Sequence, residues 1–125
     1  MPGRKIFIVD DEEDILESLN RRLTADGYAV VTAATGRDAV QKIKQVDPDL
    51  LLVDIVLPDI DGPEIIQRLK NDPQGMEKPV IFFSGIVSKE GQGKTSTVKV
   101  AGHEYPALGK PFAYEELVKL MAQYI

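Results

Sequence analysis

The chain has 125 residues and a net charge of −5 at pH 7. This length suits one domain with a buried core, and the acidic balance argues against direct binding of nucleic acid. The chain has no cysteine, which excludes disulfides and thiolate metal sites and fits a cytoplasmic location. No apolar run reaches membrane-spanning length and no signal-peptide pattern precedes the first apolar segment, so we expect no membrane association.

The first half of the chain alternates between short apolar segments and segments with helical spacing. Apolar, β-branched runs at 5–9, 28–32 and 50–53 predict three strands. Apolar residues at helical spacing follow each run, so we predict a helix after each strand. The second of these helices opens at Gly36 and the third at Pro63, a residue well suited to a first helical position.

The second half of the chain is less regular. An apolar run at 79–83 predicts a fourth strand. A short edge strand is expected over 105–108, because Pro106 is tolerated only at an edge or a bulge. Between them, the segment 86–102 is rich in Gly, Ser, Thr and Lys, and we expect a short helix over 95–101. An amphipathic helix ends the chain.

Strands that alternate with helices, without a repeat or a linker, predict an α/β fold. We expect a flavodoxin-like, doubly wound sheet of five parallel strands, written (βα)5, with helices on both faces in three layers. The carboxyl ends of all five strands then share one edge of the sheet, which is where such folds bind their ligands.

Polar residues follow four of the predicted strands. Asp10 and Asp11 follow the first, Asp54 the third and Ser84 the fourth, and Lys110 lies just after the fifth. Taken singly, each has an ordinary explanation as a helix start, a cap or a surface residue. Together they bring three carboxylates to one edge, where they repel each other unless a cation joins them. Oxygen ligands without His or Cys favour a hard ion such as Mg²⁺.

On these motifs the chain resembles, over essentially its whole length, the receiver domain of two-component response regulators. The motifs occur in the family's order: Asp10-Asp11, Leu52-Val53-Asp54, Leu57-Pro58, Asp61-Gly62, Ser84 and Lys110-Pro111-Phe112. The resemblance implies that residues 1–125 form a single receiver domain, either whole or a fragment of a longer regulator. It also implies a cis peptide bond between Lys110 and Pro111.

The resemblance implies a metal site and a phospho-acceptor. Asp54 is expected to accept a phosphoryl group from a phosphohistidine on a sensor histidine kinase or phosphotransfer protein. Asp11 and Asp54 would bind Mg²⁺ directly, with the backbone carbonyl of Val56 as a further ligand and Asp10 acting through water. The resemblance thus implies a signalling switch with autocatalytic phosphotransfer and dephosphorylation, which is not expected to turn over a dedicated substrate.

The remaining site residues would stabilise and read the phosphoryl group. Lys110 would stabilise its oxygens, and Ser84 would donate a hydrogen bond to it after transfer and draw its loop inward. The change would spread over the face of the fourth helix and fifth strand to an output domain or a partner protein. A homodimer formed on phosphorylation is one form that such an output can take.

Two features depart from the family pattern: the switch aromatic, and the interval from Ser84 to Lys110, which at 26 residues is several longer than is common. The family's switch aromatic is replaced by Ala107, with Tyr105 two residues earlier, so Tyr105 could take its place only if the strand contained a bulge. Val56 and Ile86 occupy the positions that flank the phosphoryl group, and both are apolar. Neither can orient an attacking water, so we expect slow loss of the phosphoryl group.

Two other functions are possible from the residues alone. A phosphohydrolase with an aspartate nucleophile needs a second carboxylate near Asp54, and Val56 stands where it would lie. A pseudo-receiver that binds partners without phosphorylation is disfavoured because every acceptor-site residue is present. The segment 91–96 ends like a phosphate-binding loop but has Ser88 where that motif needs glycine, and His103 reads as a solvated loop residue.

Overall fold

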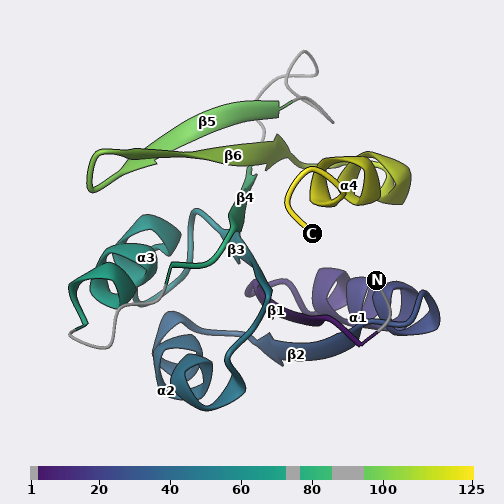
Figure 1. Ribbon diagram of the computed structural model, residues 1–125, viewed down its shortest axis with the longest axis horizontal. Coiled ribbons are helices and arrows are strands. Elements are labelled where there is room, and N and C mark those ends of the chain that lie inside the picture. The colour runs from purple at the N-terminus through teal and green to yellow at the C-terminus, as the bar shows by residue number, and fades with distance from the viewer. Residues whose placement is uncertain (1–2, 73–76, 86–94) are drawn as a thin grey trace.

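A computed structural model of the chain describes residues 3–72, 77–85 and 95–125. Its strands form one six-stranded sheet in the order β2-β1-β3-β4-β6-β5 (Figure 1). The elements along the chain are β1 Lys5–Val9, α1 Glu13–Ala25, β2 Ala29–Ala33, α2 Gly36–Val46, β3 Leu50–Asp54, α3 Gly62–Asn71, β4 Val80–Ser84, β5 Thr95–Val100, β6 His103–Gly109 and α4 Tyr114–Met121. None of the helices in these ranges is long and apolar enough to cross a membrane.

The doubly wound parallel sheet is confirmed. β1 pairs in parallel with β2 on one side and with β3 on the other, and β3 pairs in parallel with β4 and β4 with β6. These five strands are the five that the sequence predicts, in the order second, first, third, fourth, fifth. Because all five point the same way, their carboxyl ends lie along one edge of the sheet.

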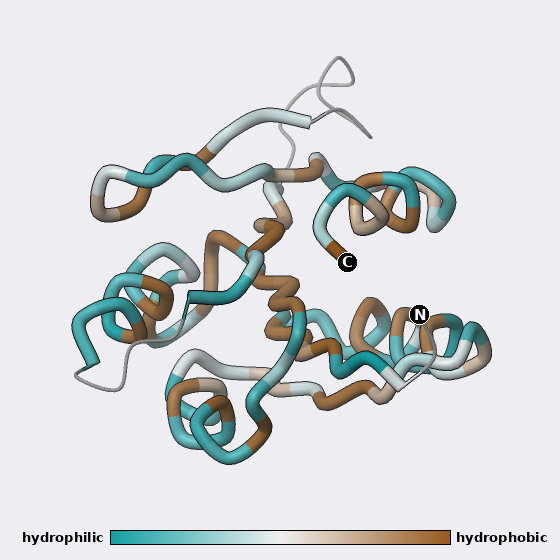
Figure 2. Tube along the Cα trace, in the orientation of Figure 1, coloured by the Kyte–Doolittle hydropathy of each residue, from teal (hydrophilic) through white to brown (hydrophobic). Residues whose placement is uncertain are grey.

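Two hydrophobic clusters, one on each face of the sheet, hold the three layers together. The strands contribute alternate residues to each: Phe7 and Val53 face α2 and α3, and Ile8 and Leu52 face α1 and α4. Figure 1 shows the two helix pairs on opposite sides of the sheet. Figure 2 shows hydrophobic residues concentrated along the central strands and on the inward sides of the helices. The apolar runs read from the sequence are therefore strands covered on both faces.

The predicted helix over 95–101 is wrong, because these residues form β5, which pairs antiparallel with β6. Buried and exposed side chains alternate along this segment, which is the pattern of a strand. Val98 and Val100 pack against the cluster that faces α2 and α3, while Thr95 and Thr97 on the other side are exposed. β-Branched residues suit such a half-buried strand better than a helix.

The fifth parallel strand, β6, is longer than predicted and does not lie at the edge. It runs between β4 and β5, and its pairing with β4 covers only Ala107 to Gly109. Pro106 lies just outside that pairing, opposite Thr97 of β5. The proline is tolerated because it falls where the parallel ladder has not yet begun.

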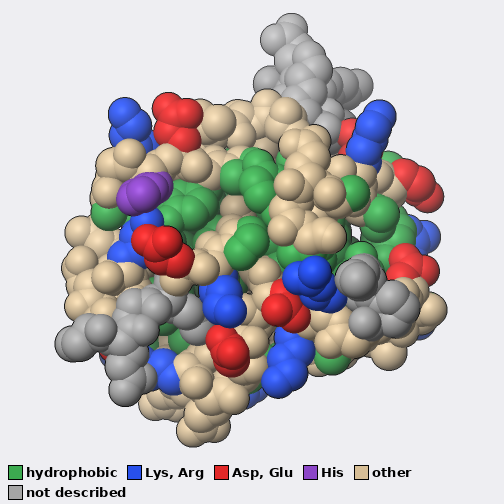
Figure 3. Space-filling view, viewed as in Figure 1, with side chains coloured by type: hydrophobic (Ala, Val, Ile, Leu, Met, Phe, Trp, Pro, Cys, Tyr) green, Lys and Arg blue, Asp and Glu red, His purple; other side chains and the backbone are tan. Residues whose placement is uncertain are grey.

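The surface carries charges of both signs. Figure 3 shows acidic and basic side chains interspersed around a middle of hydrophobic side chains on the face seen in Figure 1. Several of the charges are paired across exposed helix turns, for example Lys42 with Asp38 at 3.0 Å and Arg68 with Glu64 at 3.4 Å. Such exposed pairs contribute little to stability, so the fold depends on the two apolar clusters.

Candidate phospho-acceptor site

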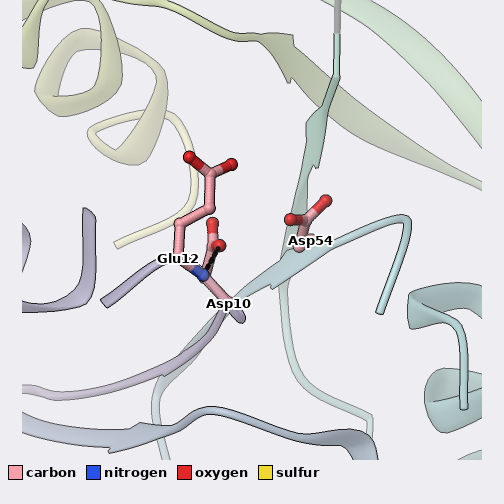
Figure 4. A group of neighbouring side chains, drawn as sticks. All are labelled: Asp10, Glu12 and Asp54. Atoms are coloured by element: carbon pink, nitrogen blue, oxygen red, sulfur yellow. Dashed lines mark hydrogen bonds between the residues drawn. The ribbon is translucent and has the colours of Figure 1, made fainter. Parts of the chain in front are cut away.

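The strand ends bring their acidic side chains together at the carboxyl edge of the sheet. Asp54 is the last residue of β3 and only 5% exposed, and Asp10 directly follows β1 and is fully buried. Glu12 precedes the first turn of α1, and its backbone N–H donates to the Asp10 Oδ1 at 2.9 Å. Figure 4 shows the three carboxyl groups close together at the ends of neighbouring strands.

Lys110 places one positive charge among these three acids. Its ammonium nitrogen lies 2.7 Å from the Oδ2 of Asp10, and it donates hydrogen bonds to Asp54 Oδ2 at 2.9 Å and Glu12 Oε1 at 3.0 Å. Lys110 follows β6, and its backbone N–H donates to the Ser84 carbonyl at 2.8 Å. From this fixed backbone position, the ammonium contacts the acids at the ends of β1 and β3.

Burial and pairing act against each other on the charges of this site. Burial raises the pKa of the Asp10 carboxyl to about 6, although the Lys110 ammonium and the Glu12 N–H favour its ionised form. Burial alone would lower the pKa of Lys110, but its contacts with Asp10, Asp54 and Glu12 outweigh burial and raise that pKa. The lysine therefore stays charged, and it is the cation that allows the acids to lie together.

The clustered carboxylate oxygens could serve as ligands of a divalent cation. Asp10, Glu12 and Asp54 each offer a carboxylate oxygen, and these oxygens lie within 4.8 Å of one another. The Asp10 Oδ2 is buried and accepts no hydrogen bond from the described residues, being balanced only by its ion pair with Lys110. An all-oxygen set of this kind is typical of Mg²⁺. A bound ion would share the carboxylates with the lysine.

Glu12 is the residue that sequence reasoning missed, and Asp11 lies apart from the group. Asp11 is exposed and is not among the three clustered acids. Its role as a direct metal ligand, and that of Asp10 through water, remain predictions. Glu12 stands next in the acidic run after Asp10 and Asp11, which is the only sequence signal for it.

The loop after β3 is fixed tightly against the acceptor. The Val56 N–H donates to Asp54 Oδ1 at 3.2 Å, and the Gly62 N–H donates to the Ile55 carbonyl at 2.9 Å. Val56 itself is 70% exposed, beside the acceptor. Its carbonyl as a metal ligand remains a prediction. Ile86, the second residue predicted to shield the phosphoryl group, lies outside the described residues.

Ser84 ends β4, beside the acceptor strand. It follows Phe83, which is paired with Asp54 across the β3–β4 ladder, and it is paired with Gly109 of β6. Ser84 therefore lies at the same edge as the acidic group, between the acceptor strand and the strand that leads to Lys110. The contact of its hydroxyl with a phosphoryl group remains a prediction.

The position of the family's switch aromatic is occupied by Ala107. Ala107 is fully buried, and Tyr105 points to the same face two residues earlier, in an unbroken pairing with β5. The Tyr105 ring packs edge-on against Phe82 at 6.0 Å, with the Lys70 ammonium 5.4 Å from its centre. The pairing of 103–108 with β5 contains no bulge, so Tyr105 does not move into the position that Ala107 occupies.

The turn after β6 has the expected geometry. The Lys110–Pro111 peptide bond is cis, as the resemblance implies. Phe112 then packs against Phe83 of β4, with 5.0 Å between the ring centres. The turn is thereby fixed to the α1/α4 face of the sheet, directly beside the lysine.

A model of one family matches residues 6–122, and its description is "Response regulator receiver domain". The chain belongs to this family. It is thus a phospho-accepting receiver domain with an acidic pocket formed by Asp10, Glu12 and Asp54 beside Lys110. Such a domain is a signalling module rather than a catalytic enzyme, and it works with a histidine kinase.

Curated relatives agree with this assignment. The chain is 35% identical to response regulator MprA of Mycolicibacterium vanbaalenii over 97% of its own length and 49% of that protein. It is 32% identical to protein PilG of Pseudomonas aeruginosa, covering 98% of the chain and 88% of PilG. It is also 32% identical to the alkaline phosphatase synthesis transcriptional regulatory protein PhoP of Bacillus subtilis, over 92% of the chain and 45% of PhoP. The chain spans about half the length of MprA and PhoP.

Solved structures share the fold. Chemotaxis protein CheY4 of Vibrio cholerae superimposes with a TM-score of 0.80 at 28% identity, covering 98% of this chain and 99% of CheY4. Response regulator TrrA of Thermotoga maritima, solved in complex with Mg(2+)-BeF, gives a TM-score of 0.75 at 24% identity and covers 98% and 99% of the two chains. The likeness to TrrA concerns the fold.

Proposed function

We propose that Asp54 accepts a phosphoryl group from the phosphohistidine of a sensor histidine kinase or phosphotransfer protein, in a step that needs Mg²⁺. The observation that carries this proposal is the Asp54 carboxylate itself, which lies at a strand end with Lys110 at 2.9 Å. An Asp54 oxygen forms a bond to phosphorus while the phosphorus–nitrogen bond of the donor breaks and its electron pair returns to the imidazole.

Mg²⁺ would be held by Asp54 and the acids beside it, and it would neutralise the charge on the transferred oxygens when bound. The predicted ligand set is Asp11, Asp54 and the Val56 carbonyl, with Asp10 acting through water. Glu12 offers an additional oxygen within the clustered group. TrrA, a structural relative, was solved with Mg(2+)-BeF, which supports the same ion here.

Lys110 would stabilise the negative charge on the transferred phosphoryl group. Its ammonium already spans Asp54 and Asp10, and it would shift its hydrogen bonds to a phosphoryl oxygen as that oxygen gains charge. Ser84 would then donate its hydroxyl to another phosphoryl oxygen. The second contact exists only in the phosphorylated form, so it would bias the two states of the switch.

A groove beside the site suits the approach of the donor. A cavity of about 530 Å³ between α1 and the start of α4 is lined by apolar residues, among them Ile15, Leu19 and Phe112, and it also reaches Glu12 and Lys110. A partner helix docked there would carry its phosphohistidine to the edge where Asp54 lies. We therefore place the kinase or phosphotransfer protein in this groove.

The output is also a proposal. Because the chain spans about half of MprA and PhoP, we propose that residues 1–125 act as the receiver domain of a longer regulator or signal to a separate partner protein, with dimerisation as one response. A cytoplasmic location follows from the donor, since a histidine kinase makes its phosphohistidine from ATP.

The test is the mass of the protein after incubation with acetyl phosphate and Mg²⁺. We expect one added phosphoryl group on the wild type and none on Asp54→Asn. Asp38→Asn, which changes a half-buried acid of α2 that is paired with Lys42 and not with the site, is the control and should be modified like the wild type. Equal modification of Asp54→Asn and the wild type would contradict the assignment, and so would wild type that remains unmodified.

A further inference from the structure

A carboxylate outside the acidic group connects the acceptor loop to a neighbouring helix. Asp59 lies in the loop between β3 and α3, five residues after Asp54. Its Oδ1 accepts a hydrogen bond from the Gly36 N–H and its Oδ2 one from the Arg37 N–H, both at 2.8 Å. Both oxygens of the side chain are therefore engaged with the first two amides of α2.

These two bonds complete the amino terminus of α2. The first amides of a helix have no partner within the helix and need an acceptor from elsewhere. Thr35, the residue before the helix, accepts from the third amide through its hydroxyl at 3.1 Å. Asp59 supplies the acceptors for the first and second amides, from a segment more than 20 residues away in the sequence. The helix and the loop are thus held together by a cap shared between them.

The contact between loop and helix is also close in its backbone. A Cβ atom on residue 36 would lie 2.8 Å from the Cβ and the carbonyl oxygen of Ile60, which is nearer than real Cβ contacts come. Glycine at position 36 therefore lets the loop approach the helix. The N–H groups of the helix then point at the Asp59 carboxylate at hydrogen-bonding distance.

The same loop carries the groups that surround the acceptor. Val56, whose N–H donates to Asp54, stands three residues before Asp59, and Gly62 at the other end of the loop donates to the Ile55 carbonyl. Asp61 caps α3 by accepting from the Glu64 N–H at 2.8 Å. The ends of the loop are fixed by these bonds, Leu57 is buried in the core, and the exposed Asp59 ties the loop to α2.

We infer that Asp59 is a positioning residue for the phospho-acceptor site, because its two bonds to α2 hold the loop that presents the Val56 backbone to Asp54 and to the metal. The inference rests on the proposed function. Asp59 itself touches neither the acceptor nor the ion. Loss of its bonds lets the middle of the loop move, so the Val56 carbonyl spends less time in the position that binds.

The charge of Asp59 matches this role. The Arg37 N–H, together with the Gly36 N–H, lowers the pKa of its carboxyl to about 2, so it is ionised throughout the range in which the protein works. A carboxylate at the amino terminus of a helix also interacts favourably with the helix dipole.

The experiment compares variants of the loop with a variant of the same helix end. Asp59→Ala removes both bonds, Asp59→Asn keeps one acceptor oxygen, and Thr35→Ala removes the third cap of α2 without touching the loop. Mg²⁺ affinity is measured by isothermal titration calorimetry. The Mg²⁺ concentration for half-maximal phosphorylation by acetyl phosphate is measured separately from the rate at saturating Mg²⁺.

We expect Asp59→Ala to weaken Mg²⁺ binding about tenfold, the usual order of effect for a residue that orients a ligand. Asp59→Asn should fall between Asp59→Ala and the wild type. Thr35→Ala should bind Mg²⁺ as the wild type does, although it weakens the same helix. Amide exchange of Val56 in the metal-free protein should be faster in Asp59→Ala and unchanged in Thr35→Ala.

Equal Mg²⁺ affinity in Asp59→Ala and the wild type would overturn the inference, and so would an equal loss in Thr35→Ala, which would assign the effect to helix stability. Neither result affects the proposed function, which fails only if wild-type protein is not modified at Asp54. Failure of the inference about Asp59 can therefore be told apart from failure of the proposed function.

Discussion

Gly62 lies directly against the backbone carbonyl of Asp54, with no room between them for a side chain. A Cβ on residue 62 would also meet a side-chain carbon of Val53 at 3.1 Å. The first residue of α3 can therefore approach the end of β3 only because it is glycine. This close approach closes the acceptor loop through the bond from Gly62 to the Ile55 carbonyl.

We predict that Gly62→Ala destabilises the protein by about 1–3 kcal/mol, the usual cost of forcing an extra carbon into a packed site. Phosphorylation by acetyl phosphate should slow as well, because the strain falls on the backbone of Asp54. Urea unfolding and intact-mass kinetics measure the two effects. Gly85→Ala is the control, since a Cβ there meets nothing within 4 Å, and it should leave stability close to that of the wild type.

Mg²⁺ should stabilise the folded protein. An ion that binds only the folded state adds about 1.4 kcal/mol at a concentration ten times its Kd, which raises the melting temperature by several degrees. Thermal melts with and without millimolar Mg²⁺ measure this. A wild-type melt that does not respond would count against the metal site.

Lys110→Met should show a larger response to Mg²⁺ than the wild type. The substitution leaves Asp10, Glu12 and Asp54 without their shared counter-charge, so the metal-free variant should lose about 2–4 kcal/mol of stability. Mg²⁺ should recover a large part of this loss, while phosphorylation remains impaired for want of the ammonium. If Mg²⁺ stabilises the variant no more than the wild type, the lysine and the ion do not share these carboxylates.

The metal-free protein should become less stable as the pH rises from 4 to 6. Because the pKa of Asp10 is raised from 3.8 to about 6, the folded state binds more protons than the unfolded state within this window. Stability therefore falls as the carboxyl ionises, by about 3 kcal/mol at most from this group. Unfolding by urea at several pH values in protein freed of divalent cations gives the profile.

Asp10→Asn isolates that contribution. The variant should lack this part of the pH dependence and should be about 1–3 kcal/mol more stable than metal-free wild type at pH 7, because it buries no ionised carboxyl. Its gain from Mg²⁺ should be smaller. Identical pH profiles for variant and wild type would show that Asp10 is not the group responsible.

The phosphorylated form should be long-lived. Val56 lies exposed beside the acceptor and offers no group that can hold a water in line for attack. Val56→Asn combined with Ile86→Glu should speed the decay of phospho-Asp54 about tenfold or more, since each ~1.4 kcal/mol of barrier is a factor of ten. Decay is followed by intact mass after removal of the donor. Unchanged or slower decay in the double variant would refute the shielding role.

The fold and most of the site could be predicted because they depend on local patterns. The run from Leu50 to Val53 is apolar on both sides of the strand, and Asp54 ends it abruptly, so the strand and its functional end were visible together. Parallel topology then requires Asp10 and Lys110 to meet at the same edge. Glu12 could not be assigned, because its contact with Lys110 joins residues 98 apart and depends on where the long side chains reach.

The strand β5 was missed for a different reason. The segment 86–102 is rich in Gly, Ser, Thr and Lys, and Val98, Val100 and Ala101 indicated the core face of a short helix. The local evidence was the alternation of Val98 and Val100 with exposed residues, followed by Ala101 and Gly102. Both of these turn residues have positive φ, at 50° and 83°, which is what a two-residue hairpin requires. Alanine is uncommon at positive φ, so Ala101 gave no indication of this turn in the sequence.

Ala101 should therefore be replaceable with a gain in stability. A residue other than glycine, asparagine or aspartate is strained at positive φ, so Ala101→Gly or Ala101→Asn should stabilise the protein by about 0.5–1 kcal/mol. Thermal or urea unfolding checks this. Ala25→Gly, at the end of α1, is a matched change and should destabilise by a similar amount. A loss of stability in Ala101→Gly would contradict the hairpin.

The hairpin of β5 and β6 overhangs the rest of the sheet. Among the described strands, β4 pairs with Ala107 to Gly109 only, and the part from His103 to Pro106 pairs with β5. Seven residues of extended strand reach about 20 Å from Gly109 to the turn. This part of the hairpin packs on α3 instead, since Val100 is buried in the cluster on that face and the Lys70 ammonium of α3 lies over the Tyr105 ring. Because β6 runs from this packed end to the residue before Lys110, one strand connects the surface of α3 with the lysine that binds the acceptor.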